Sequence, residues 1–190
     1  EAVGFDFDHG RLDVSHHPFC GGVPTDVRMT TRYTTGEFLS SLMGIIHETG
    51  HGLYEQGLPL AHLGTALGQS VGMAVHESQS RLWENQVGRG RPFWKFFEPR
   101  FRELFPAAMA KVSSEELYLA INAVRPTLIR VDADEVTYPA HVILRYEIER
   151  ALIDGEIEAA HVLACGFHNL QPGLNDLRAD AVAWNHDNAV

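Results

Sequence analysis

Two histidines four residues apart, with a glutamate directly after the first, are the residues of this sequence best suited to chemistry. They lie in the run His47-Glu-Thr-Gly-His51. On a helix, positions i and i+4 share one face, so His47 and His51 can bind the same metal ion, and neutral imidazoles suit Zn²⁺. Glu48 would lie beside that ion, where its carboxylate can take a proton from a metal-bound water. The pattern therefore predicts hydrolysis by a metal-activated water.

A catalytic zinc ion also needs a third protein ligand and an open position for water. Glu77 follows the first histidine after a turn that contains glycine and proline, and a helix–turn–helix return would bring it back over the first helix. Apolar residues just before Glu77 indicate that this part of the second helix is buried, which favours Glu77 as an anionic third ligand. The neighbouring His76 offers a three-histidine site as the alternative, so the residues alone leave two candidates.

The elements that must position these groups are mostly helical in pattern. Apolar periodicity and one capping box predict helices over about 36–56, 68–87, 113–124 and 140–153. Strand-like runs occur at 26–35, 128–131 and 135–138. The aromatic run 92–101 is expected to break at Pro99, because proline lacks the backbone N–H that a helix interior uses.

The 190-residue chain has the composition of a globular protein of one domain, or of one domain and a fraction. Asp and Glu (25) outnumber Lys and Arg (15), and the net charge of −10 argues against nucleic acid or an anionic membrane as a partner. Two cysteines, Cys20 and Cys165, are too few for a disulfide framework, and no signal-peptide pattern is present, so we expect a cytoplasmic protein. The uncharged stretch 57–75 is interrupted by proline and glycine, which argues against a transmembrane span.

Five short motifs follow one another along the chain. They are His17-Pro-Phe19, Asp26-Val-Arg-Met-Thr30, His47-Glu-Thr-Gly-His51, His76-Glu-Ser78 and Ile129-Arg-Val-Asp-Ala-Asp134. Together they resemble the motifs of the carboxypeptidase Taq family, the thermostable zinc carboxypeptidases. The resemblance covers roughly Gly4 to Gly155, so we expect a catalytic-core segment at 1–155 and a divergent tail at 156–190.

The resemblance implies a mainly α fold, a helical zinc-metallopeptidase core with a small β-sheet beside the active-site cleft. It implies removal of single residues from the free C-termini of peptides. By the family pattern, His47, His51 and Glu77 bind Zn²⁺ and Glu48 is the general base. We expect that other divalent transition metals such as Co²⁺ can substitute for zinc. The resemblance also implies a homodimer.

A carboxypeptidase must also recognise the free carboxylate of its substrate. The planar guanidinium of an arginine binds a carboxylate through two hydrogen bonds, and the candidates are Arg130 and Arg28. His17, held extended by the proline after it, and Tyr138 are candidate donors to the substrate carbonyl or to the developing oxyanion.

Two departures from the family affect these expectations. Family members are much longer, and their downstream motif Gly-x-x-Gln-Asp-x-His-Trp is not found here, so we expect only weak cleavage and a chain that self-associates. One alternative is a non-catalytic zinc-binding remnant of the family. The other is an endopeptidase or aminopeptidase built on the same zinc helix, which would need no arginine for the substrate carboxylate.

Overall fold

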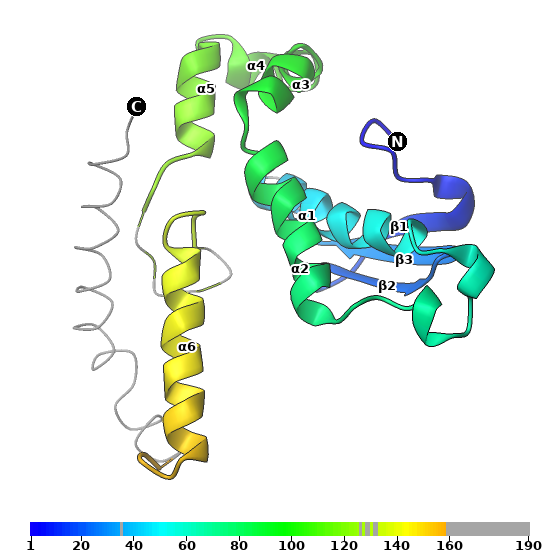
Figure 1. The fold of residues 1–190 in the computed structure, drawn as a ribbon. Helices are drawn as coiled ribbons and strands as arrows, with labels where there is room; N and C mark the ends of the chain where they lie inside the picture. Colours follow the sequence, from blue (N-terminus) through cyan, green and yellow to red (C-terminus); the bar gives the residue numbers. More distant parts are fainter. Residues whose placement is uncertain (35, 126, 128–129, 131–132, 159–190) are drawn as a thin grey trace. The chain divides into compact units, whose positions relative to one another are not determined.

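The computed structural model describes residues 1–34, 36–125, 127, 130 and 133–158. The chain divides into two compact units, Glu1–Ile121 and Asn122–Val190, which we describe separately. The first unit contains a small sheet and a series of helices, and the second contains one long described helix (Figure 1). The expected fold class, mainly α with a small β-sheet, is confirmed.

Three strands form the sheet, in the order β1-β3-β2: β1 (Gly10–Val14), β2 (Phe19–Val23) and β3 (Asp26–Thr31). The central strand β3 runs parallel to β1 and antiparallel to β2. Successive side chains of a strand point to opposite faces, so Val27 and Met29 are buried while Arg28, between them, is exposed. The sheet therefore has one face toward the core and one toward solvent.

Helix α1 (Leu39–Gln56) packs on the buried face of this sheet. Its Leu53 contacts a cluster formed by Phe5, Val27 and Met29. A side chain at Gly52 would come within 2.7 Å of the Phe5 ring, so this glycine lets the helix lie close to the cluster. The predicted helix 36–56 is confirmed, and its position is fixed by apolar packing.

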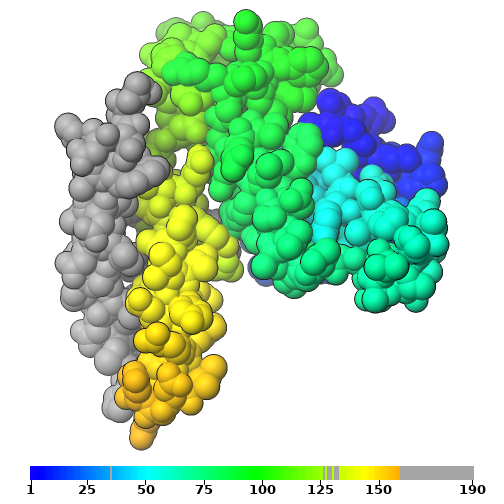
Figure 2. Space-filling model, viewed as in Figure 1, coloured from blue at the N-terminus to red at the C-terminus, as the bar shows by residue number. Residues whose placement is uncertain are grey.

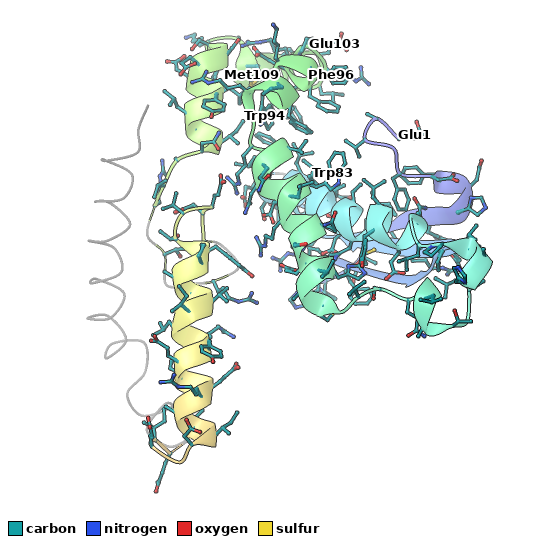
Figure 3. All side chains as sticks on the ribbon, in the orientation of Figure 1. Glu1, Trp83, Trp94, Phe96, Glu103 and Met109 are labelled. Carbon is teal, nitrogen blue, oxygen red and sulfur yellow. The ribbon has the colours of Figure 1, made fainter. Side chains whose placement is uncertain are left out.

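A second apolar cluster lies at the start of α1, among α3 (Arg91–Leu104), α4 (Pro106–Met109) and α5 (Ser114–Ile121). Its buried members are Met43, Ile46, Trp94, Met109, Leu117 and Ile121. Figure 3 labels two of them, Trp94 and Met109, in the group of helices α3 and α4. The Trp94 indole N–H donates to the carbonyl of Gly88 at 2.9 Å, so the buried ring has a partner for its polar atom.

The expected break of the aromatic run at Pro99 is wrong, because α3 continues through this residue. Proline inside a helix costs about 3 kcal/mol. On the same helix, Trp94 is buried and Phe101 packs against Phe38, with ring centroids 4.4 Å apart. This aromatic packing outweighs the local preference of the proline.

Helix α2 (Met73–Arg81) continues directly into a π-helical turn, Leu82–Val87. Together they form the second predicted helix, which begins later than residue 68. Gly72 has a φ of 108°, which a helix does not allow, so α2 begins only after it. The burial expected from the apolar residues before Glu77 is wrong, because Val71, Ala74 and Val75 are exposed. The blue-green segment between α1 and α2 forms much of the surface seen at the right of Figure 2.

In the second unit, α6 (Tyr138–Ile153) confirms the predicted helix 140–153. The strand expected at 135–138 is wrong, because residues 135–137 form a turn. The Asp134 carboxylate accepts hydrogen bonds from the backbone N–H groups of Val136 and Thr137, both at 2.9 Å, and this stabilises the turn that leads into α6.

Three of the four residues of the other expected strand, 128, 129 and 131, lie outside the described residues, as does nearly all of the expected tail 156–190. The boundary between a core segment and a tail therefore stays a prediction. Among the described helices, none has both the length and the apolar character that crossing a bilayer requires.

Candidate metal centre

Three side chains of the first unit come together between α1 and α2. The Nε2 atoms of His47 and His51 lie 3.7 and 3.3 Å from the same oxygen, Oε2 of Glu77. All three ligand atoms lie within 4.8 Å of one another, and these residues are the one group of this kind among the described residues. Ligands about 2.1 Å from a tetrahedral ion lie about 3.4 Å apart. Two nitrogens and one carboxylate oxygen at these distances fit a divalent metal.

Close packing of the two helices brings Glu77 to the histidines. A side chain at Gly50 would come within 2.6 Å of the Ser80 Cα and 2.7 Å of the Gln79 carbonyl oxygen. Ser80 is fully buried, and its hydroxyl donates to the Glu77 carbonyl at 2.7 Å. The glycine inside the His-Glu-x-x-His motif therefore lets the backbone of α2 approach α1.

Glu48 is buried beside the histidines, with 7% of its surface exposed. Burial raises the pKa of its carboxyl, although the nearby His47 and His51 act in the opposite direction. Within the described part of the chain, no group hydrogen-bonds this carboxylate. A buried carboxylate without such a partner is free to accept a proton, as a general base must.

The Glu77 carboxyl behaves differently. Its burial opposes ionisation, but the hydrogen bond with His51 and the charges of His47 and Arg81 lower its pKa to about 2. Arg81 also donates to Glu77 Oε1 at 3.1 Å, which leaves Oε2 toward the histidines. Glu77 is thus an anion, and its Oε2 faces the metal position.

The other ring nitrogens of the two histidines also have partners. His47 Nδ1 lies 2.8 Å from Glu84 Oε2, and His51 Nδ1 lies 2.6 Å from His76 Nδ1. The second nitrogen of His76 lies 2.7 Å from Glu55 Oε1. Both nitrogens of His76 are thus engaged behind His51, and the structure brings Glu77, the other sequence candidate, to the metal-facing nitrogens.

Glu55 and Glu84 were not among the site residues predicted from the sequence. A pattern for each was present, because Glu55 lies four residues after His51 and Glu84 lies seven residues after Glu77. Such spacings place each carboxylate on the same helix face as a site residue. These spacings alone do not identify which of the many carboxylates on helix faces contacts a histidine.

Two of the four predicted substrate-binding residues, Arg28 and His17, lie in the first unit, and neither is hydrogen-bonded or ion-paired to His47, His51 or Glu77. Arg28 is on the exposed face of β3, where it pairs with Asp26 at 2.9 Å. His17 is exposed in the loop before β2, and its carbonyl accepts a hydrogen bond from the Thr30 hydroxyl at 2.8 Å.

Arg130 and Tyr138 both lie in the second unit. The structure brings these two together, since Arg130 donates to the Tyr138 hydroxyl at 2.7 Å. The substrate roles of all four residues stay predictions.

The similarity of this chain to known proteins is consistent with a metal centre at these residues. The sequence profile of the family described as carboxypeptidase Taq (M32) metallopeptidase matches residues 1–169. The chain belongs to this family. The match extends beyond Gly155, where the sequence resemblance was expected to end. Membership in the M32 metallopeptidase family implies a divalent metal, and His47, His51 and Glu77 are the residues that could hold it.

Two curated relatives are similar to most of this chain. Thermostable carboxypeptidase 1 of Thermus thermophilus is 54% identical over 157 residues, which are 82% of this chain and 31% of the relative. Carboxypeptidase 1 of Bacillus subtilis is 44% identical over 158 residues, which are 83% of this chain and 32% of the relative. The chain thus spans about a third of the length of the curated relatives that it matches.

Solved structures show the same similarity. The M32 carboxypeptidase from Deinococcus radiodurans R1 aligns with a TM-score of 0.87 and 45% identity, covering 91% of this chain and 35% of that one. Trypanosoma cruzi metallocarboxypeptidase 1 aligns with a TM-score of 0.77 and 50% identity, covering 84% of this chain and 32% of that one. The fold described above is therefore an M32 fold over most of its length.

Proposed function

We propose that this chain carries the catalytic centre of a zinc-dependent carboxypeptidase. The observation that carries the proposal is the convergence of His47, His51 and Glu77 on one point, with the buried Glu48 beside them. Two imidazoles and a carboxylate form a ligand set that catalytic zinc ions use, with a fourth position left for water or substrate. Co²⁺ has similar ligand preferences and is expected to substitute.

The chemistry follows from the residues in place. His47, His51 and Glu77 would hold the ion, which when bound polarises the substrate carbonyl and lowers the pKa of water. The Glu48 carboxylate accepts a proton from the attacking water and delivers it to the leaving amine. Burial raises the pKa of Glu48, which makes it a better proton acceptor than a solvated carboxylate.

The proposed substrate is a peptide with a free C-terminus. Arg130 or Arg28 would bind its terminal carboxylate, and His17 or Tyr138 would donate to the carbonyl that is attacked. The contact between Arg130 and Tyr138 supports a role for these two as a pair. The exposed position of Arg28 leaves its guanidinium accessible to a ligand.

A peptide-cleavage assay tests the proposal. We expect zinc to bind with about one ion per chain, and free peptides to be trimmed slowly from the C-terminus. Glu48→Gln should retain the metal and lose about 10²–10⁴-fold in turnover, the usual contribution of a general base. A chelator should abolish cleavage. Loss of the metal itself in Glu48→Gln would contradict the assignment of Glu48 as a base beside the ion.

Blocked substrates separate the alternatives. Amidation of the peptide C-terminus removes the charge that an arginine would bind, so it should suppress cleavage by a carboxypeptidase. Equal cleavage of amidated and free peptides would support an endopeptidase on the same zinc helix. Bound zinc with no cleavage of either peptide would support a non-catalytic remnant.

We also propose that the chain forms a homodimer. Large apolar side chains are exposed along the segment between α1 and α2 and at the start of α2: Leu60, Leu63, Leu67, Val71 and Met73. Such a cluster of exposed apolar residues is typical of a surface that a partner covers. Light scattering tests this proposal, and a mass of 21.1 kDa at micromolar concentration would contradict it.

A further inference from the structure

We propose that Glu84 and the Glu55–His76 pair are positioning residues, which fix the ring tautomers of His47 and His51. Each would hold a proton on the Nδ1 atom of its histidine, so that Nε2 is the atom that each ring offers to the ion. The inference rests on the proposed metal centre and assigns to three further residues the task of preparing it. None of them would contact the ion itself.

The partner of His47 is a carboxylate. Glu84 Oε2 lies 2.8 Å from His47 Nδ1, and the Arg81 guanidinium donates to that same oxygen at 2.8 Å. An oxygen that accepts from Arg81 also acts as an acceptor toward the imidazole, so the proton of the neutral ring belongs on Nδ1. The Nε2 atom of His47 then carries a lone pair, as a metal ligand requires.

The partner of His51 is a second imidazole, and the direction of that hydrogen bond is decided one step further back. His76 Nε2 lies 2.7 Å from Glu55 Oε1, and a carboxylate oxygen favours an N–H on the nitrogen that faces it. In a neutral ring, a proton on His76 Nε2 leaves Nδ1 as an acceptor. His51 must then donate from its Nδ1 across the 2.6 Å contact, which leaves its Nε2 free for the metal.

The local backbone brings Glu84 to His47. Glu84 lies in the π-helical turn that follows α2, where Gly88 N–H bonds to the Trp83 carbonyl at 2.7 Å, five residues back. Turns of this type are rare and occur frequently at functional sites. In this one, Arg81 reaches Glu77 on one side and Glu84 on the other, so a single guanidinium orders both carboxylates.

These contacts are shielded from water. The side chains of His47 and Glu84 are 17% and 16% exposed, and those of His76 and Glu55 are 11% and 16% exposed. Water competes weakly for such hydrogen bonds, so they can hold a tautomer. Partners of this kind typically contribute 10–100-fold to the affinity for the metal.

Two readouts test the inference. The first is ¹⁵N NMR of the histidine side chains in the metal-free protein, which shows directly which ring nitrogens carry a proton. We expect His47 and His51 to carry the proton on Nδ1 in the parent chain. Glu84→Ala should return His47 to a mixture of tautomers, and His76→Ala should do the same for His51.

The second readout is Zn²⁺ affinity measured by competition with a chelator. We expect Glu84→Ala and His76→Ala each to lower the affinity about 10–100-fold. Glu84→Gln keeps an acceptor oxygen and should lose less. The matched control is Glu98→Ala, since Glu98 is 15% exposed and pairs with Arg102 in α3, outside the metal centre. The control should retain the parent affinity and tautomers, and circular dichroism would verify that each variant is folded.

The outcomes separate this inference from the proposed function. Parent-like tautomers and affinity in both Glu84→Ala and His76→Ala would overturn the positioning role while leaving the metal centre intact. Absence of zinc binding in the parent chain would overturn the proposed function. In that case the tautomers still decide the inference, because NMR needs no metal.

Discussion

The first unit contains two sets of paired charges that look alike in their distances and differ in their surroundings. In the metal centre, Arg81 lies 2.8 Å from Glu84, and on the outer face of the sheet Arg28 lies 2.9 Å from Asp26. The side chains of the first pair are 26% and 16% exposed, and those of the second are 64% and 53% exposed. Short contacts are thus common to both regions, and burial is what distinguishes them.

The difference has a physical consequence. A solvated ion pair contributes little, because water and salt screen it and the long side chains lose freedom when they pair. A buried charge must keep its partners, since removing one leaves the other in a medium that solvates it poorly. Substitutions between α1 and α2 are therefore expected to have large effects, and substitutions on the outer face of the sheet small ones.

The largest effect is expected from His47→Ala combined with His51→Ala. The double variant removes two of three ligands, so zinc binding should be abolished. Metal content after dialysis measures this directly. The matched control is His9→Ala combined with His16→Ala, which removes two exposed histidines and should leave the metal content unchanged. Retention of one zinc ion per chain in the first variant would refute the site.

A substitution that touches no ligand should have the next largest effect. Gly50→Ala places a methyl group within 2.6 Å of the Ser80 backbone, which cannot turn away as a side chain would, so α2 must move from α1. We expect a loss of about 1–3 kcal/mol in the free energy of unfolding and at least about a tenfold loss in zinc affinity.

The control for this prediction lies in the same helix. A side chain at Gly44 would contact Pro18 at 3.5 Å, an ordinary van der Waals distance, so Gly44→Ala should be tolerated. Urea denaturation and chelator competition on both variants would check the pair. Equal effects at the two positions would show that helix separation at Gly50 does not control the site.

The same contrast explains what the sequence could predict. The spacing of His47 and His51 requires only a helix, and the apolar period of α1 supplies that helix, so both ligands follow from local pattern. Glu77 needed one long-range assumption, that the chain turns back on itself. Glu55 and Glu84 could not be singled out from the sequence, because the role of each carboxylate depends on which imidazole it faces in the folded chain.

Elsewhere the long-range packing overrides the local pattern. Pro99 predicted a break that aromatic packing around Trp94 and Phe101 prevents. The alternation of β3 predicted a strand, while its parallel pairing with β1 is a long-range contact that alternation does not specify. Local rules thus located most elements, and the contacts between elements decided the rest.

Neutralising Glu48 and neutralising Glu77 should change the stability of the metal-free protein in opposite directions. The pKa of the Glu48 carboxyl is higher in the folded state than in the unfolded state, so folding favours its protonated form. This contribution to the free energy of unfolding is fully present below the unfolded pKa of about 4.5, and it is lost as the pH rises through the pKa of the folded state. Glu48→Gln should therefore stabilise the metal-free protein at neutral pH, by on the order of 1 kcal/mol or about 2–4 °C in melting temperature.

The charge of Glu77 has the opposite effect on stability. Its pKa is lowered to about 2, so its stabilisation is present above about 4.5 and is lost as the pH falls toward 2. Glu77→Gln should lower the melting temperature of the metal-free protein at neutral pH. Thermal melts of both variants at pH 7 and pH 4 would test the pair. Destabilisation by Glu48→Gln at pH 7 would contradict the effect assigned to burial.

The smallest effect on stability is expected on the outer face of the sheet. Arg28 lowers the pKa of Asp26 through a side-chain hydrogen bond, yet both groups are solvated, so Arg28→Ala should leave the thermal midpoint and the zinc affinity unchanged. A stability-neutral variant also gives a clean test of substrate binding. If Arg28 binds the substrate carboxylate, Arg28→Ala raises KM for free peptides and leaves the residual cleavage of amidated peptides unaltered. If KM is unchanged, Arg28 has no role in substrate binding and Arg130 remains the candidate. A large drop in melting temperature or in zinc affinity would instead show that burial does not separate the two regions as we infer.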